Sequence, residues 1–143
     1  MTRGELDPEV IRRHLSMLRE ALANLRRHAG RSAPELRVNA DLRWTVERGL
    51  QLCVQNVLDI ATHLSAAAGL DAPDYASAID RLAELAVVPA AFAALLRPIA
   101  GFRNVLVHGY LQVDLGILER VLREKLGEME EFAVFVDTYL ASR

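Results

Sequence analysis

Four side chains within one short run could carry out chemistry on a phosphodiester: Arg103, Asn104, His108 and Tyr110. Arg103 is a permanent cation whose forked donors suit a phosphate, and the imidazole of His108 can exchange a proton near neutral pH. Asn104 adds an uncharged donor and acceptor, and Tyr110 adds a phenolic oxygen. Because Val and Leu separate these groups, the run could equally be a core segment with a buried histidine and an arginine that caps a helix. The residues alone leave both interpretations open.

The spacing within this run limits what one chain can do. Asn104 and His108 are four residues apart and therefore share one face of a helix. Arg103 and His108 are five apart, so their positions diverge by about 140° around an ideal helix of about 3.6 residues per turn. One helix aligns them poorly unless it breaks near Gly109. A two-fold dimer would instead bring two copies of the segment into one cleft.

The same run, Arg-Asn-x-Leu-Val-His-x-Tyr followed by Val-Asp, resembles the signature of the HEPN superfamily. Together with the segments 47–51 (Glu-Arg-Gly-Leu-Gln) and 58–64 (Leu-Asp-Ile-Ala-x-His-Leu), it resembles more closely the HepT-like toxins of toxin–antitoxin pairs. The resemblance extends over nearly the whole chain, although the N-terminal helix matches only in its apolar pattern. It implies a HEPN-like helical fold.

The resemblance also implies an activity: metal-independent cleavage of RNA, with tRNA among the candidate substrates, by the toxin of a type VII toxin–antitoxin pair. The ribose 2′-hydroxyl would attack the adjacent phosphate, with His108 as general base or acid. Arg103 would hold the phosphate and stabilise the transition state, and Asn104 would orient the histidine or a phosphate oxygen. The product would carry a 2′,3′-cyclic phosphate, and DNA, which lacks the nucleophile, should resist. The family's composite sites imply a homodimer, its further assembly being open, and no cofactor.

Tyr110 has a separate implied role. In HepT-like toxins the tyrosine of this motif receives AMP from a partner, a minimal nucleotidyltransferase antitoxin. AMP on Tyr110 would add negative charge beside Arg103 and block RNA, whereas the alternative is that Tyr110 packs against the final helix. A second hypothesis is a non-catalytic HEPN module that binds a nucleotidyltransferase or a nucleotide. A third is a helical scaffold whose dimerisation is its only function.

Length and composition narrow the class of protein. A chain of 143 residues suits one domain over residues 1–143. Its formal net charge of −2 argues against nonspecific coating of nucleic acids. The sole cysteine, Cys53, rules out a disulfide framework and sits in an apolar run, which indicates a core residue. His14, His28 and His63 lack acidic partners at ligand spacing, so we expect no metal site, and we expect His14 and His28 to be exposed among arginines.

The remaining observations concern location and the second predicted helix. No signal-peptide pattern opens the chain and no apolar run approaches a membrane span, so we expect a cytoplasmic protein without a membrane partner. Glu47 and Arg48 could line the cleft or form surface ion pairs. Asp59 and His63 are four residues apart, so they could form a hydrogen bond along one helix face, which is the simpler interpretation, or take part in the functional site.

Apolar residues recur every three or four positions in five segments, which predicts an all-α, up-and-down bundle of about five helices. The expected ranges are Asp7 to Gly30, Asn39 to about Gly69, Tyr75 to Ala86, Pro89 to Gly109, and Asp114 to the C-terminus. Residues 31–37 should form a connector, and Pro98 should kink the fourth helix just before Arg103. The long apolar stripe of the second helix predicts that it packs on more than one neighbour, including another subunit.

Overall fold

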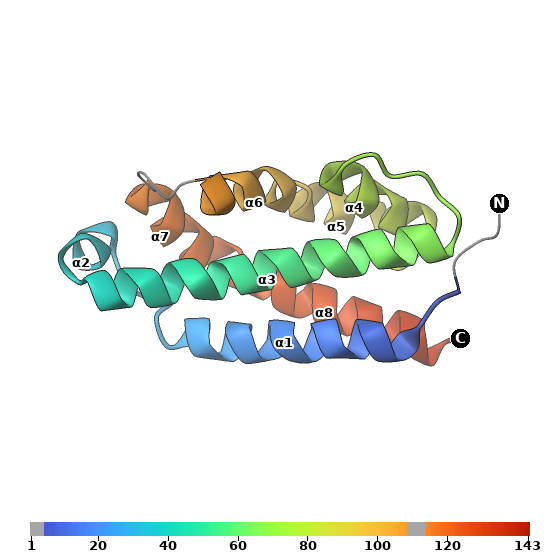
Figure 1. The fold of residues 1–143 in the computed structure, drawn as a ribbon, viewed down its shortest axis with the longest axis horizontal. Coiled ribbons are helices and arrows are strands. Elements are labelled where there is room, and N and C mark those ends of the chain that lie inside the picture. Colours follow the sequence, from blue (N-terminus) through green and yellow to red (C-terminus); the bar gives the residue numbers. More distant parts are fainter. Residues whose placement is uncertain (1–4, 109–113) are drawn as a thin grey trace.

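The structure, a computed structural model, describes residues 5–108 and 114–143, with the backbone alone at His108. Within these residues it contains eight α-helices and no strand (Figure 1). The helices are α1 (Pro8–Arg26), α2 (Ala33–Val38), α3 (Ala40–Ala67), α4 (Tyr75–Glu84), α5 (Ala90–Leu96), α6 (Ile99–His108), α7 (Leu115–Glu124) and α8 (Leu126–Ala141). The all-α prediction is confirmed over this part of the chain.

The predicted number of about five helices is wrong, because one expected connector contains a helix and two expected helices are each divided in two. The expected connector 31–37 contains α2, because Ser32 and Glu35 form a reciprocal capping box. The fourth expected helix is divided at Pro98 into α5 and α6, since proline lacks the N–H that a continuous helix needs. The last expected helix is interrupted at Lys125, two residues before Gly127, which is a weak helix former.

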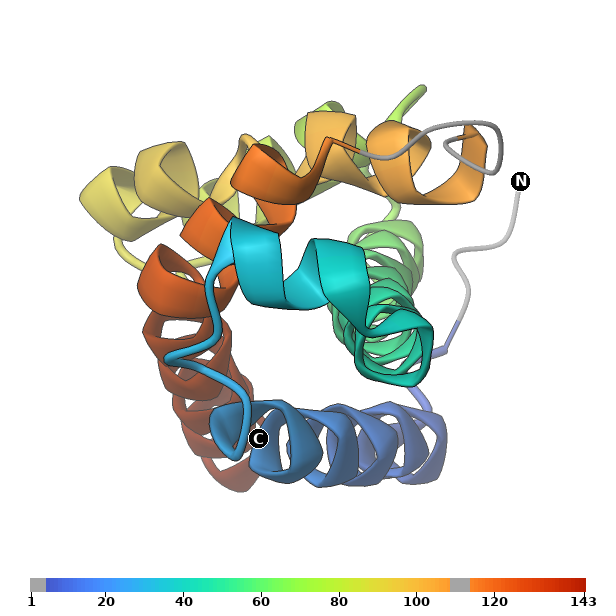
Figure 2. The ribbon, with the colours of Figure 1, turned by 90° about the vertical axis from the view of Figure 1, so that its left-hand side faces the viewer.

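Helix α3 lies at the centre of the arrangement and contacts α1, α4 and α6, while α8 packs on α1. Figure 1 shows α3 running between α1 on one side and α4, α5 and α6 on the other. The end-on view in Figure 2 shows α6, α3 and α1 one below another along one side of the molecule. The prediction that the second long helix has several neighbours is therefore confirmed within the chain.

The contact between α1 and α3 is close because of a glycine. A Cβ atom at Gly49 would lie 2.7 Å from Leu25 Cδ2 and 2.9 Å from Leu25 Cγ. One turn further along α3, Cys53 is fully buried, as predicted. Burial, and secondarily the negative charge of Glu130, raises the pKa of the Cys53 thiol to about 12. The thiol is therefore a packing group rather than a nucleophile.

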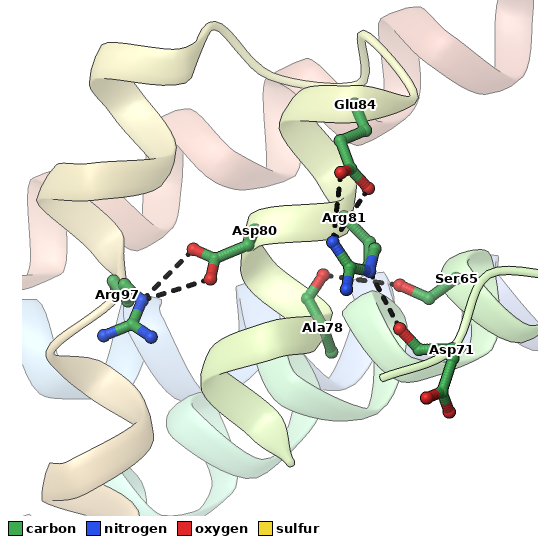
Figure 3. Close-up of polar contacts among 7 residues, drawn as sticks. All are labelled: Ser65, Asp71, Ala78, Asp80, Arg81, Glu84 and Arg97. Atoms are coloured by element: carbon green, nitrogen blue, oxygen red, sulfur yellow. Dashed lines mark hydrogen bonds and ion pairs between the residues drawn. The ribbon is translucent and has the colours of Figure 1, made fainter. Parts of the chain in front are cut away.

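Polar contacts around α4 hold the segment that leads into α6 in place (Figure 3). Arg97, between α5 and α6, donates from Nε to the two carboxylate oxygens of Asp80 on α4 at 3.1 and 3.3 Å. Arg81 Nε donates to the carbonyl of Asp71 at 2.8 Å, which holds the loop before α4. Ser65 of α3 donates to an α4 carbonyl at 3.3 Å. Through α4, the start of α6 is thus tied to α3.

The expectation that no apolar run approaches the length of a membrane span is wrong for one segment. The segment Ala90–Val107 has 18 residues with a mean hydropathy of 1.4, which is long and apolar enough for a membrane span. The same segment is divided between α5 and α6, and it includes Arg97 and Arg103. Its Phe92 and Leu96 belong to the buried core. Such a segment is weak evidence for a membrane span, because core helices meet the same test.

Candidate active site between α3 and α6

A groove of about 260 Å³ lies between α3 and α6, and Arg103 is one of its lining residues. Its polar lining comes from Arg48, Gln51 and Gln55 on α3 and from Arg103 on α6, and Leu106 and Val107 contribute apolar surface. The helical spacing explains the lining of α3, because residues 48, 51 and 55 lie three and four apart and therefore share one face. The groove brings cationic and amide groups together beside apolar walls.

Arg103 is held in this groove by three neighbours. Its Nε donates to Gln55 Oε1 at 3.2 Å, and its guanidinium carbon lies 5.4 Å from the centre of the Tyr75 ring, within cation–π range. Its Nη1 donates to Asn104 Oδ1 at 3.4 Å. No carboxylate of the described residues lies within 4.0 Å of Arg103, in contrast to the ion-paired Arg97. The charge of Arg103 therefore remains available to an anion.

Gln55 connects Arg103 to a second layer of polar groups. Its Nε2 donates to Asp59 Oδ1 at 2.8 Å, one turn further along α3. The same Nε2 lies 3.4 Å from the hydroxyl oxygen of Tyr75. Since Nε2 donates to these groups, Oε1 is left to accept from Arg103. The amide orientation, and with it the position of the guanidinium, is thereby fixed.

A second glutamine anchors the C-terminal end of α6 on α3. The last carbonyls of a helix have no partner within it, and Gln51 Nε2 donates to one of them, the carbonyl of Leu106, at 3.2 Å. Gln51 Oε1 in turn accepts from Arg48 Nη1 at 3.4 Å. Gln51 thus holds the backbone two residues before His108.

The other predicted site residues are placed only in part. Helix α6 runs without interruption from Ile99 to His108, so the positions of Arg103 and His108 diverge by about 140° around its axis. Asn104 is exposed, shares a face with position 108, and contacts Arg103. Gly109 and Tyr110 lie outside the described residues. The catalytic roles of Arg103 and His108 and the modification of Tyr110 stay predictions.

The structure places the residues of α3 whose roles the sequence left open. Arg48 lines the groove, whereas Glu47 is not among its lining residues. Burial raises the pKa of Glu47, and the positive charge of Arg43 opposes that shift. The predicted hydrogen bond between Asp59 and His63 is wrong: Asp59 accepts from Gln55, and His63 Nε2 accepts from the backbone N–H of Asp7 at 3.5 Å.

The expectation that His14 and His28 are exposed is also wrong, since both are half-buried. His14 Nδ1 lies 2.8 Å from Asn56 Oδ1. Nδ1 of His28 is buried without a hydrogen-bond partner among the described residues. Burial, followed by the positive charges of Arg27 and Arg31, lowers the pKa of His28. Over the described ranges, no three His, Cys, Asp or Glu side chains are grouped as metal ligands would be.

The sequence interpretation missed Gln55 and Tyr75 as neighbours of Arg103. The residues Arg48, Gln51, Gln55 and Asp59 recur at three- and four-residue intervals beside the apolar stripe of α3. That polar stripe was a usable indication of a second, functional face on the helix. Tyr75 gave no such indication, because it reaches the site only through the packing of α4 against α3 and α6.

Comparison with known protein families decides the classification. The sequence model of the family described as "Ribonuclease HepT-like" matches residues 18–136. The chain belongs to this family. The match includes α3 and α6 and therefore both walls of the groove.

Individual relatives agree with the assignment. The mRNA nuclease HepT of Shewanella oneidensis is 28% identical over 92 residues, which cover 64% of this chain and 69% of the relative. The tri-AMPylated HEPN toxin of Shewanella oneidensis, solved in complex with its MNT antitoxin, has a TM-score of 0.77 at 20% identity, covering 90% of this chain and 97% of the toxin. Bacillus subtilis YutE, a cytosolic protein of unknown function, reaches 0.82 at 21% identity, covering 97% and 94%. At these identities the structural likenesses show a shared fold.

Proposed function

We propose that this HepT-like protein is the toxin of a toxin–antitoxin pair and cleaves RNA without a metal ion. The observation that carries the proposal is the state of Arg103. Its guanidinium is oriented by Gln55 and Tyr75 on the wall of a groove, and no carboxylate of the described chain neutralises it. A cation held in this way suits the phosphate of a substrate. The HepT relative named an mRNA nuclease supports RNA as that substrate.

In the proposed reaction the ribose 2′-hydroxyl attacks the adjacent phosphorus while His108 removes its proton. A second acid, the other copy of His108 or water, protonates the departing 5′ oxygen. Arg103 stabilises the negative charge that develops on the phosphoryl oxygens. Asn104, beside Arg103, orients the histidine or a phosphate oxygen. The products are a 2′,3′-cyclic phosphate and a free 5′-hydroxyl.

We propose that the complete site forms only in a homodimer. The continuous α6 places positions 103 and 108 on diverging faces, so one chain does not direct both residues at the same phosphate. Apolar side chains near the groove support a protein interface there. Val105 and Val107 of α6 are 37% and 42% exposed, and Trp44, one turn before Arg48, is 64% exposed. A two-fold interface over these residues would bury them and join two grooves.

Regulation by AMP transfer is the second part of the proposal. A partner nucleotidyltransferase would transfer AMP from ATP to the Tyr110 hydroxyl with release of pyrophosphate. The phosphate then added two residues beyond His108 would compete with RNA for Arg103. The tri-AMPylated HEPN toxin that shares this fold, solved with its MNT antitoxin, supports this mode of control.

A non-catalytic HEPN module that only binds a nucleotidyltransferase or a nucleotide is the alternative. The groove favours the enzyme, because Gln55 and Tyr75 orient Arg103 on its wall and the motif contains both Arg103 and His108.

The test is cleavage of a labelled single-stranded RNA by the purified protein in the presence of EDTA. We expect a 2′,3′-cyclic phosphate product and no cleavage of the matching DNA. Arg103→Ala should abolish cleavage, whereas Arg13→Ala, which removes an exposed arginine of α1 without an ion pair, should not. Loss of activity with EDTA, or equal rates for the two variants, would overturn the proposed chemistry.

A further inference from the structure

A second groove, of about 470 Å³, runs between α1 and α3. Its polar lining comes from Asn24, Arg27 and His28 near the C-terminal end of α1, and from Thr45 and Arg48 on α3. Asn24, Arg27, Thr45 and Arg48 are all exposed. No carboxylate is among the lining residues, and the two cations and the uncharged hydrogen-bonding groups lie beside apolar surface from Ala21, Gly49 and Leu52.

The arginines of this groove are not neutralised, in contrast to their neighbours. Arg26 is adjacent to Arg27 in sequence but pairs with Glu130 on α8, and Arg19 of the same helix pairs with Asp137 at 2.5 Å. Arg27 and Arg48 have no carboxylate within 4.0 Å among the described residues, which include every aspartate and glutamate of the chain. In a protein of net charge −2, this groove is a local concentration of positive charge.

The two grooves adjoin each other, because Arg48 and Leu52 line both of them. Arg103 on α6, Arg48 on α3 and Arg27 at the C-terminal cap of α1 thus follow one another across three helices. Those helices lie one below another along one side of the molecule (Figure 2). The axes of packed helices lie about 8–10 Å apart, so a line that crosses three helices extends over about two such spacings. The line of arginines is therefore longer than a single phosphate.

We propose that the α1–α3 groove binds the phosphate backbone of single-stranded RNA beyond the scissile position, with Arg27 and Arg48 as the phosphate ligands. Asn24 and Thr45 hydrogen-bond to sugar or phosphate oxygens. The proposal rests on RNA as the ligand of the Arg103 groove. An acidic protein would also match the charge, but RNA is favoured because the cations continue the line that starts at Arg103. The exposed apolar residues that the core of a protein interface would use, Trp44 and Val107, are not part of the α1–α3 groove.

The experiment measures binding separately from cleavage. A short fluorescein-labelled single-stranded RNA with 2′-O-methyl groups has no nucleophile, so the affinity of the full chain can be followed by anisotropy as salt is varied. The test variant is Arg27→Gln, and the matched control is Arg12→Gln. Arg12 lies on the same helix, is exposed, and has no carboxylate within 4.0 Å among the described residues, but it lies about 22 Å along α1 from Arg27.

We expect Arg27→Gln to raise the Kd several-fold and to reduce the slope of log K against log salt by about 0.7, the value for one phosphate contact on a single strand. Asn24→Asp, which places a carboxylate in the groove, should weaken binding more strongly. Arg12→Gln should change neither quantity. All three variants should unfold at the parental temperature. In cleavage assays, Arg27→Gln should raise KM and leave kcat unchanged, because it lies outside the reacting groove.

Several outcomes would overturn the inference. These are equal affinities for Arg27→Gln and Arg12→Gln, no RNA binding by the parental protein, or a variant at Arg27 that binds RNA normally but loses the nucleotidyltransferase partner. The last result would make the groove a protein interface. Binding with the expected salt slope but no cleavage would support the groove and overturn the nuclease proposal. RNA cleavage by the parental protein with no effect of Arg27→Gln on binding or cleavage would support the nuclease proposal and overturn the RNA-binding role of the α1–α3 groove.

Discussion

Replacing Gln55 by leucine should slow RNA cleavage without unfolding the protein. The substitution keeps the size of the side chain while it removes the acceptor that Arg103 Nε contacts at 3.2 Å and the donor that Asp59 contacts at 2.8 Å. Arg103 keeps its contact with the Tyr75 ring but loses the contact that fixes its direction. The groove would therefore keep the positive charge of Arg103, but the guanidinium would no longer be held in one direction.

The size of the effect follows from the kind of bond that is lost. A hydrogen bond to a charged group contributes about 1.5–3 kcal/mol, and the lower value applies here because Arg103 is only half-buried. Since about 1.4 kcal/mol corresponds to a factor of ten in rate, kcat should fall about tenfold. Thermal stability should change little, because Gln55 is itself half-buried and outside the apolar core.

The assay is steady-state cleavage of a labelled RNA, with the dimer verified by sedimentation. Tyr75→Phe is the matched control, because it retains the ring beneath Arg103 and removes only a hydroxyl that lies 3.4 Å from Gln55 Nε2. It should stay close to the parental kcat. A folded, dimeric Gln55→Leu protein with a kcat within about twofold of the parental value would refute the idea that Gln55 positions Arg103.

Three further predictions concern packing, titration and assembly. Gly49→Ala should destabilise the fold by about 1 kcal/mol, because the added Cβ atom would collide with Leu25. In a Leu25→Ala background the same change should stabilise the fold, because only the gain in helix propensity remains. A double-mutant cycle by chemical denaturation measures both effects. The pKa of the Cys53 thiol is near its ordinary value of 9.0 in the unfolded chain and about 12 in the folded protein. The free energy of unfolding is therefore unaffected by this thiol below pH 9 and falls as the pH rises above 9, by about 1.4 kcal/mol at about pH 10. Unfolding of Cys53→Ala should lack that component, and an unchanged pH slope would contradict it. Trp44 is the sole tryptophan and is 64% exposed, so its fluorescence emission should shift to the blue when dimers form at higher protein concentration. Trp44→Ala should raise the dissociation constant of the dimer. Emission that does not change with concentration across the monomer–dimer transition would exclude Trp44 from the interface.

Local rules in the sequence predicted where several of the helices begin. Asp7, Asn39 and Asp114, the first residues of three expected helix ranges, cap α1, α3 and α7 with their side chains. Breaks inside long apolar patterns were harder to predict. Pro98 was expected to bend a helix but ends one, and the interruption at Lys125 has only the nearby Gly127 as its indication.

The candidate site was predictable only where its residues are close in sequence. Arg103 and Asn104 follow one another and contact each other, as a motif suggests. Gln55 and Tyr75 are 48 and 20 residues away from their partners, Arg103 and Gln55 respectively. Such contacts depend on how α3, α4 and α6 pack, which side-chain periodicity does not specify. The expected hydrogen bond between Asp59 and His63 failed for a different reason, because Asp59 accepts from Gln55 of the same helix and His63 accepts from Asp7.

The most direct test of the central claim is complementation between two inactive variants. In a composite site, a mixed dimer of Arg103→Ala and His108→Ala chains still supplies one intact arginine and one intact histidine to the shared cleft. Each variant alone should be inactive, and co-expressed chains should recover RNA cleavage on the order of a quarter of the parental rate, because about half of the dimers are mixed and each has lost half of its groups. Mixed dimers, verified by differently tagged chains, that show no recovery would contradict the account. So would parental activity in either variant alone.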